Sequence, residues 1–238
     1  MVAEWQTGKV VRIVEANHNT RRYFIRTDNP LPFDFKPGQF VTLDLPIHEK
    51  KNKRWRSYSI ASAPNGTNEF ELLIVLLETG LGTPYLFHEF HEGDSLTFRG
   101  PLGAFCLPEK IEHDYFFICT GTGIAPFRSM LQTIQQNNLQ TKNIFLVFGT
   151  RTQSTILYND EMKNLEKQLP HFTFIPVLSR EQWNGKQGYV HEVYTELAVH
   201  YPQAHFMLCG WRNMVDDAKV HLAEMGIDKD QIKYELYG

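Results

Sequence analysis

The segment Gly121-Thr-Gly-Ile-Ala-Pro126 has the composition of a phosphate-binding turn. It follows a short apolar run and precedes a segment with helical periodicity. Glycines let the backbone approach a phosphate, and the free N–H groups of a helix N-terminus attract the anion. Pro126 suits the first helical turn, where a missing N–H leaves no bond unmade. The spacing differs from G-x-G-x-x-G, so an ordinary strand-to-helix turn is the alternative interpretation.

Arg56-Ser-Tyr-Ser59 is a second segment with residues suited to ligand binding. On a strand, Arg56 and Tyr58 point to one face and Ser57 and Ser59 to the other. A guanidinium can bind a phosphate through two hydrogen bonds, and a phenol ring can lie against a flat heterocycle. Taken alone, this tetrapeptide fits a solvated arginine beside a half-buried tyrosine better.

Gly80-Leu-Gly-Thr-Pro84 is the third such segment. The pattern predicts Thr83 as the N-cap of a short helix and Pro84 as its first residue. The N-terminus of that helix would be a second place able to receive a phosphate. Simple capping explains the same residues, and the two interpretations do not exclude each other.

These segments belong to a chain of 238 residues, which allows one to two domains at roughly 150 residues each. Up to about Gly100, runs rich in β-branched and aromatic residues alternate with Gly, Pro and Asn. This pattern predicts a small antiparallel six-stranded β-barrel, interrupted by one short helix near residues 84–90. The predicted strands are residues 9–16, 22–27, 39–45, 56–61, 69–77 and 95–99.

After residue 112 the rhythm changes to alternating strands and helices. The segments 127–134 and 214–225 place apolar residues on one helical face, and Gly226 stands where a C-terminal capping glycine belongs. This alternation predicts an α/β doubly wound parallel sheet, and hence domains at residues 1–108 and 109–238. The predicted parallel strands are residues 115–119, 144–149, 172–178, 205–209 and 232–236.

Composition narrows the class of protein. The net charge of −3 argues against a nucleic-acid binder, and no apolar run approaches the roughly 18 residues of a membrane span. The first residues lack the layout of a secretory signal. Cys106, Cys119 and Cys209 are far apart and odd in number, so we expect neither a disulfide framework nor a metal site. A cytoplasmic protein is the expectation.

Six motifs, in order and spacing across nearly the whole chain, resemble the ferredoxin–NADP⁺ reductase family. The resemblance implies an FAD-binding barrel followed by an NAD(P)-binding α/β domain, and therefore an FAD-dependent NAD(P)H oxidoreductase. Cytochrome b5 reductases and oxygenase reductases share these motifs, so they specify the two-domain module better than its partner. The motifs are Arg56-x-Tyr58-Ser59, Gly80-x-x-Thr83, Gly100-Pro-x-Gly103-x-Phe105, Gly121-Thr-Gly-Ile-Ala-Pro126, Cys209-Gly210 and Met214.

The resemblance implies that residues of the barrel half bind FAD. Tyr58 would stack on the isoalloxazine ring, and Ser59 would form a hydrogen bond near flavin N5. Arg56 and Thr83 would hold the FAD pyrophosphate. The expected FAD-binding residues are Arg56, Tyr58, Ser59, Ile74, Gly82, Thr83 and Tyr237.

Residues of the second half would bind the nicotinamide dinucleotide. Thr122 and the turn at Gly121-Thr-Gly-Ile-Ala-Pro126 would hold its pyrophosphate, and Cys209 and Gly210 would border the nicotinamide. A buried cysteine is usually an inert core thiol. Cys209, however, ends a predicted parallel strand, and the carboxyl ends of such strands bind ligands. The expected residues are Gly121, Thr122, Gly123, Pro126, Arg151, Ser179, Arg180, Lys186, Tyr189, Cys209, Gly210 and Met214.

Glu235-Leu-Tyr237 resembles the Glu-x-Tyr ending of plant-type members, in which the tyrosine covers the flavin and the glutamate assists electron and proton transfer. Such stacking contributes about 0.5–1.5 kcal/mol, so a nicotinamide ring can displace it. The expected catalytic residues are Ser59, Cys209, Glu235 and Tyr237. Two departures from the family pattern are Gly238, which comes after the tyrosine, and Arg212, which replaces the proline of Cys-Gly-x-Pro-x-Met. A frayed tail with Tyr237 against the core is the alternative.

The choice of nucleotide depends on the residues directly after the second and third parallel strands. A fold that selects NAD commonly ends its second strand with an acid, and here Phe148-Gly-Thr-Arg151 has none. Ser179-Arg-Glu-Gln182, with Lys186 and Tyr189 behind it, resembles the 2′-phosphate site of plant-type reductases and favours NADPH. Trp183-Asn-Gly185 resembles NADH-using relatives, and a solvated basic loop is a further alternative.

The electron acceptor is less determined. Three cysteines cannot hold a plant-type [2Fe–2S] cluster, so electrons would pass to a separate ferredoxin, flavodoxin or oxygenase component. The basic run Lys50, Lys51, Lys53 and Arg54 is suited to an acidic carrier, or is a solvated loop. A free-flavin reductase, an electron-transfer subunit of a larger complex, and a non-redox nucleotide-binding module are the alternative functions.

Overall fold

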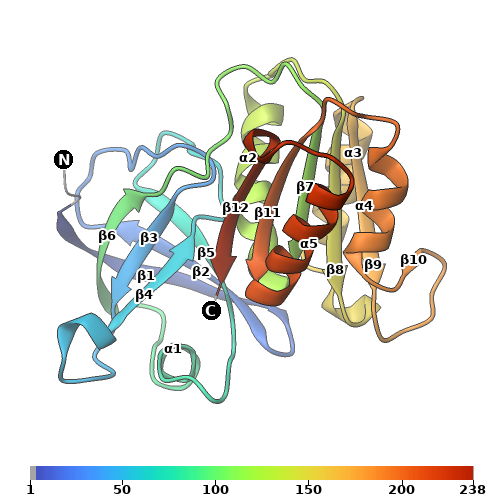
Figure 1. Cartoon of the computed structure of the whole chain (residues 1–238). Coiled ribbons are helices and arrows are strands. Elements are labelled where there is room, and N and C mark those ends of the chain that lie inside the picture. The colour runs from blue at the N-terminus through green and yellow to red at the C-terminus, as the bar shows by residue number, and fades with distance from the viewer. Residues whose placement is uncertain (1–3, 238) are drawn as a thin grey trace. The chain divides into compact units, whose positions relative to one another are not determined.

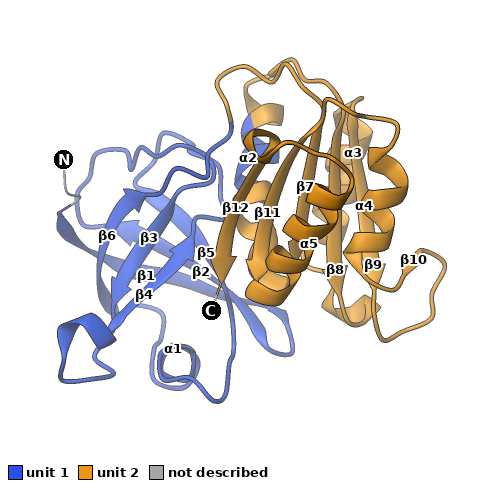
Figure 2. Ribbon diagram, viewed as in Figure 1, with its two compact units in different colours: residues 1–107, 128–133 blue, residues 108–127, 134–238 orange. Residues whose placement is uncertain are grey.

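The computed structural model describes residues 4–237, which form two compact units (Figure 1, Figure 2). Unit 1 comprises Met1–Leu107 and Arg128–Thr133, and unit 2 comprises Pro108–Phe127 and Ile134–Gly238. Sequence reasoning assigned residues 128–133 to the second domain, whereas the structure groups them with the first unit.

Unit 1 is built on an antiparallel sheet in the strand order β4-β3-β6-β1-β2-β5. The edge strands β4 and β5 are joined by an isolated bridge between Ile60 and Leu72, and Ala61 N donates to Glu71 O at 2.8 Å. These contacts close the sheet, as the barrel prediction requires. The strands are β1 (Trp5–Asn17), β2 (Thr20–Thr27), β3 (Phe40–Asp44), β4 (Trp55–Ser59), β5 (Glu69–Val75) and β6 (Ser95–Leu102).

The short helix of unit 1, α1 (Gly82–His88), begins two residues before the predicted segment. Its N-cap is Leu81 and its first residue is Gly82, so the predictions that Thr83 caps the helix and that Pro84 begins it were both wrong. The Thr83 hydroxyl instead accepts from Leu77 N at 2.8 Å and lies 3.3 Å from Leu77 O. A threonine hydroxyl can form hydrogen bonds with the backbone of a loop as readily as with the first N–H groups of a helix. Here it bonds to the loop before the helix.

Unit 2 is a parallel sheet in the order β10-β9-β8-β7-β11-β12 (Figure 1). Its strands are β7 (Tyr115–Thr120), β8 (Ile144–Thr150), β9 (Phe172–Leu178), β10 (Lys186–Gln187), β11 (His205–Trp211) and β12 (Ile232–Tyr237). Its helices are α2 (Ile124–Gln136), α3 (Asn159–Gln168), α4 (Val190–Ala198) and α5 (Arg212–Glu224). The two-residue strand β10 was not predicted, because it is too short to show a pattern.

Helices cover both faces of the parallel sheet, which explains why its strands are continuous apolar runs. Phe116 packs in one core with residues of α4 and α5. Phe117, on the opposite face, stacks on Phe127 of α2 with ring centroids 4.7 Å apart. Gly226 follows Met225, the C-cap residue of α5, with a φ of 78°, which confirms the predicted capping glycine. Among residues 4–237, no helix combines the length and apolar character needed to cross a membrane.

Candidate active site

The carboxyl ends of β7 and β11 lie side by side in the parallel sheet of unit 2. The short 3₁₀ turn η2 (Gly121–Gly123) follows β7, and α2 starts next, with Pro126 in its first turn as predicted. A Cβ atom at Gly123 would lie 2.2 Å from the carbonyl oxygen of Cys209, so only glycine fits. The turn therefore brings bare backbone and the first N–H groups of α2 to the edge where such folds bind ligands.

Gly210 provides a second place without room for a side chain. Its φ is 147°, and a Cβ atom there would lie 2.6 Å from Thr120 Oγ1. Thr120 Oγ1 is buried and has no hydrogen-bond partner in the described part of the chain. An unsatisfied hydroxyl beside Gly210 fits a phosphate-bearing ligand, which would supply the missing bond. Arg212 is the first residue of α5, so this helix begins without the family's proline.

Cys209 lies in a row of polar side chains across three strands. Its register partners are Cys119 on β7 and Glu235 on β12. Burial raises the pKa of the Cys209 thiol well above its ordinary value, the Glu235 charge and the Cys119 thiol raise it further, and a hydrogen bond with Tyr237 opposes them. The thiol is thus protonated at neutral pH and fully buried, which does not suit a nucleophile.

The predicted nucleotide-selecting residues converge at the ends of β8 and β9. Arg180 N donates to Arg151 O at 3.0 Å, and Ser179 N donates to Thr150 O at 3.0 Å. Arg151 and Arg180 are exposed, so both guanidinium groups can reach an anionic ligand. The next residue, Glu181, accepts from Gln153 N at 2.8 Å and holds the adjoining loop.

Lys186 does not share this arrangement. Its Nζ atom lies 2.9 Å from Glu196 Oε2, and the pair lowers the pKa of that carboxyl group. Its charge is thus compensated within unit 2. Tyr189 is the residue before α4, and 67% of its surface is exposed. Within residues 4–237, no hydrogen bond holds its ring toward Arg180.

In unit 1, β4 carries Arg56, Tyr58 and Ser59 as predicted. Arg56 Nη1 donates to Trp55 O at 2.8 Å and to Lys53 O at 3.1 Å. A Cβ atom at Gly82 would lie 2.9 Å from Arg56 Cγ, so this glycine makes room for the arginine. Burial raises the pKa of Tyr58, which keeps its phenol neutral. A fixed guanidinium and a neutral ring on one strand fit a flavin with its pyrophosphate.

Three further expected FAD contacts stand differently. Ile74 is 1% exposed and packs in the barrel core, so its side chain is not available to a ligand in this structure. The hydroxyl of Thr83 is engaged with the loop before α1. Tyr237 belongs to unit 2, where it contacts Cys209, and its contact with flavin stays a prediction. Gly238 lies outside the described residues.

Sequence reasoning missed two features of this site. Cys119 and Cys209 are 90 residues apart in the chain, and their spacing gave no sign that they would be register neighbours on β7 and β11. Glu71 and Arg128 form a buried ion pair in unit 1. Glu71 and Arg128 each have apolar neighbours in the chain, which could have indicated that they are buried but not that they are paired.

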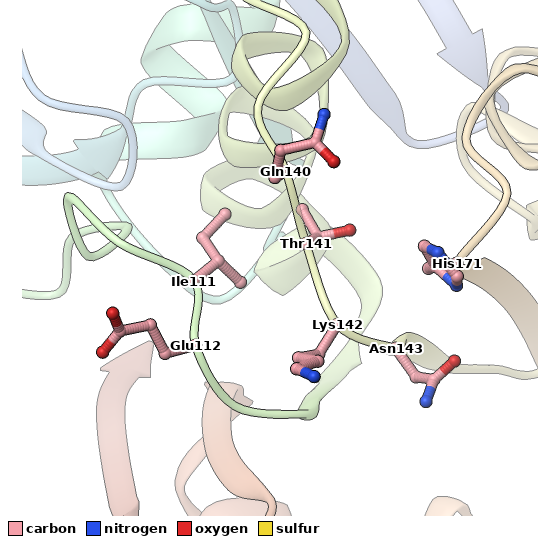
Figure 3. A pocket seen from close by; sticks show the side chains of 7 residues that line it. All are labelled: Ile111, Glu112, Gln140, Thr141, Lys142, Asn143 and His171. Atoms are coloured by element: carbon pink, nitrogen blue, oxygen red, sulfur yellow. The ribbon is translucent and has the colours of Figure 1, made fainter.

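A shallow pocket opens at the opposite, amino-terminal edge of the parallel sheet (Figure 3). None of its lining residues was expected in a site. Asn143 is engaged by Asp114, whose Oδ1 accepts from Asn143 Nδ2 at 2.8 Å. We therefore assign this pocket no part in the chemistry. It is lined by Ile111, Glu112, Gln140, Thr141, Lys142, Asn143 and His171.

The two units match two family models. Residues 7–106 match the oxidoreductase FAD-binding domain, and residues 117–220 match the oxidoreductase NAD-binding domain. A fold of this kind, with a barrel for FAD and an α/β unit for a nicotinamide dinucleotide, defines an FAD-dependent NAD(P)H oxidoreductase.

Curated relatives narrow the family. The chain is 34% identical over 214 residues to ferredoxin–NADP reductase B of Sorangium cellulosum, covering 86% of each protein. It is 33% identical over 206 residues to the anthranilate 1,2-dioxygenase electron transfer component of Acinetobacter baylyi, covering 86% of this chain and 58% of that protein. The chain belongs to the ferredoxin–NADP⁺ reductase family, as the motifs predicted.

Solved structures of reductases support the same family assignment. A ferredoxin–NADP⁺ reductase from Neisseria gonorrhoeae with bound FAD and NADP has a TM-score of 0.81 and 27% identity, covering 98% of this chain and 99% of that one. A cytochrome P450 reductase from Amycolatopsis has a TM-score of 0.88 and 25% identity, with 98% of this chain covered and 69% of that one. The chain thus spans 99% of the Neisseria reductase but only 58% of the Acinetobacter component.

Proposed function

We propose that this protein is an FAD-dependent NAD(P)H reductase that passes electrons to a separate carrier protein, either a ferredoxin, a flavodoxin or an oxygenase component. The observation that carries the proposal is that one chain has two surfaces, one suited to a flavin and the other to a nicotinamide dinucleotide. Unit 1 presents Arg56 and Tyr58 on β4, and unit 2 presents the Gly123 and Gly210 cradle. FAD, when bound, supplies the chemistry of accepting a hydride and releasing electrons one at a time.

The residues of the chain have positioning and electrostatic tasks in this proposal. Arg56 holds pyrophosphate, and the neutral Tyr58 ring supports the isoalloxazine. Ser59, which ends β4 and is 4% exposed, would lie near flavin N5. Cys209 would border the nicotinamide, and its thiol, which is fully buried in this structure and kept protonated by that burial, would not act as a nucleophile. Glu235, beside Cys209, and Tyr237, hydrogen-bonded to it, assist proton and electron transfer.

NADPH is the proposed donor. Arg151, Ser179 and Arg180 gather after β8 and β9 with two exposed guanidinium groups, which suit a 2′-phosphate. The acceptor is proposed from the relatives, because one is named a ferredoxin–NADP reductase and another a dioxygenase electron transfer component. A cytoplasmic location is also proposed, supported by three free thiols, which are typical of reducing compartments.

Anaerobic stopped-flow absorbance tests the proposal. The protein is reconstituted with FAD, passed through gel filtration, and mixed with NADPH or NADH. We expect bound flavin to bleach at about 450 nm, in the absorption band of the oxidised cofactor, with either donor and faster with NADPH. Second mixing with an acidic [2Fe–2S] ferredoxin should reoxidise the flavin. Loss of all FAD during gel filtration would favour a free-flavin reductase, and absence of bleaching with both donors would overturn the proposal.

A further inference from the structure

Glu71 and Arg128 are the only charged residues among those described in residues 4–237 that are fully buried, at 2% and 5% exposure. Both belong to unit 1, Glu71 on β5 and Arg128 in the part of α2 that groups with the barrel. Charged side chains are almost never buried without partners, since their removal from water costs several kcal/mol. Their retention in the interior therefore needs a reason other than hydrophobic packing.

The geometry of the cluster is tight. Arg128 Nη1 lies 3.0 Å from Glu71 Oε2 and donates to Ala61 O at 2.8 Å. Arg22 of β2 contacts the same carboxylate from the other side, with Nε 2.7 Å from Oε1 and Nη2 3.0 Å from Oε2. One carboxylate thus accepts from two guanidinium groups, and one guanidinium also fixes a backbone carbonyl.

The cluster holds the chain directly after the flavin strand. Ala61 N donates to Glu71 O at 2.8 Å, and Glu71 N donates to Ser62 Oγ at 3.0 Å. Ala63 N donates to Gln132 Oε1 at 2.9 Å, one turn beyond Arg128 in α2. Each residue from Ala61 to Ala63 is therefore tied to β5 or α2. Ser59, which the proposed function places near flavin N5, ends β4 just two residues before Ala61.

We propose that Arg128 and Glu71 are positioning residues that fix the segment Ala61–Ala63 and, through it, the orientation of Ser59 at the flavin. This inference rests on the proposed function, since it assigns these residues to the same flavin site. Stability alone is a poor explanation, because replacing a buried ion pair with apolar residues of similar volume is often neutral or stabilising. A segment held at three successive residues, by contrast, keeps its preceding serine in one orientation.

The test compares four full-length, FAD-loaded variants in anaerobic stopped flow with NADPH. Arg128→Met breaks the cluster, Arg128→Lys keeps the charge, and the double variant Arg128→Met with Glu71→Leu removes both charges. Arg26→Met is the matched control, because Arg26 and Glu69 form an exposed ion pair on β2 and β5, the strands that carry Arg22 and Glu71. Thermal unfolding and the visible circular dichroism of the bound flavin are measured beside the rates.

We expect Arg128→Met to lower the limiting rate of flavin reduction at least tenfold, with KM for NADPH within twofold and an altered flavin spectrum. Arg128→Lys should recover a large part of the rate. The double variant should unfold near the wild-type temperature and still be slow, which separates positioning from stability. Arg26→Met should match the wild type.

Two outcomes would overturn the inference. A wild-type limiting rate in Arg128→Met would show that the cluster does not act on the flavin. Recovery of both rate and stability in the double variant would reduce the cluster to a structural role. If the unmutated protein itself is not reduced by either donor, the proposed function fails instead, and these variants are not needed to show it.

Discussion

The two candidate binding surfaces of this chain differ in whether the backbone or the side chains form them. In unit 2 the backbone forms the surface, because Gly123 and Gly210 approach neighbouring atoms so closely that no side chain fits. In unit 1 the side chains form it, since Arg56 and Tyr58 project from one face of β4. Unit 2 should therefore be intolerant of any added atom at its turns, whereas unit 1 should respond to the chemistry of each side chain.

Gly123→Ala should have the largest effect. The added Cβ would lie 2.2 Å from Cys209 O, a backbone atom that cannot move without distorting β11. We expect a loss of nucleotide affinity of at least a hundredfold, measured by titration calorimetry with NADP⁺, and unchanged FAD content. Gly121→Ala is the comparison variant, because nothing lies within 4 Å of its Cβ and only its φ of 53° is strained. Equal affinity in both variants would show that close approach is not what limits the turn.

Arg180→Ala should come next. A charge-assisted hydrogen bond contributes about 1.5–3 kcal/mol, which corresponds to a loss of roughly ten- to a hundredfold. We expect kcat/KM to fall by that factor for NADPH and by less than twofold for NADH. Lys186→Ala is the control, since its charge is already paired with Glu196. The idea is wrong if the unmutated protein prefers NADH, or if both donors lose equally.

Tyr58→Ala should weaken FAD binding by a smaller factor. Aromatic stacking adds about 0.5–1.5 kcal/mol beyond burial, so we expect roughly two- to tenfold weaker retention of FAD on dilution. Tyr58→Phe should behave like the wild type, because the phenol is neutral and the ring is what stacks. If the phenylalanine variant loses FAD as readily as alanine, the hydroxyl rather than the ring holds the flavin.

The order of elements was predictable because periodicity is local. Strands of unit 2 are buried on both faces, so runs such as residues 144–149 stood out, and α2 was visible from its apolar face. The turn at Gly121 was predictable for the same reason, since glycine spacing, strand and helix all adjoin in the chain.

The partners of charged side chains were not predictable. Glu71 meets Arg128 across 57 residues, and Lys186, in the two-residue strand β10, meets Glu196 of α4. Such pairs depend on strand register and on how a helix is rotated, which no single-chain pattern records. Thr83 shows the same limit at short range, because its hydroxyl had two possible backbone partners and took the one in the loop.

The basic run in unit 1 offers a smaller effect. Lys50, Lys51 and Lys53 are exposed, and Arg54 is paired with Asp44 at 2.8 Å. Replacing the three lysines with glutamine should slow reduction of an acidic ferredoxin several-fold at low salt and flatten its salt dependence, because steering is electrostatic. Reduction of ferricyanide is the comparison reaction. If the ferredoxin rate keeps its full salt dependence in the triple variant, this loop is not the docking surface.

The smallest expected effect is a difference between the two units in how their stability depends on pH. Burial lowers the pKa of His191 in α4, and His221 lowers it further, while Asp217 and Glu192 oppose them. The fold therefore favours neutral His191, whereas the unfolded chain takes up a proton below a pH of about 6.5. Stability should fall as pH drops through that value towards the lower folded pKa, since the unfolded state then binds more protons.

His205 of β11 shifts in the same direction, through burial and the neighbouring His113 and Lys233, so both groups place the acid-sensitive stability in unit 2. Urea midpoints at pH 7.5 and 5.5 should differ less in His191→Gln than in the wild type, with the exposed His200→Gln as control. Amide exchange at pH 5.5 should rise in α4 and β11 before it rises in β1 and β2. An equal rise in both units would mean that carboxylates throughout the chain, rather than these two imidazoles, determine the loss of stability at acidic pH.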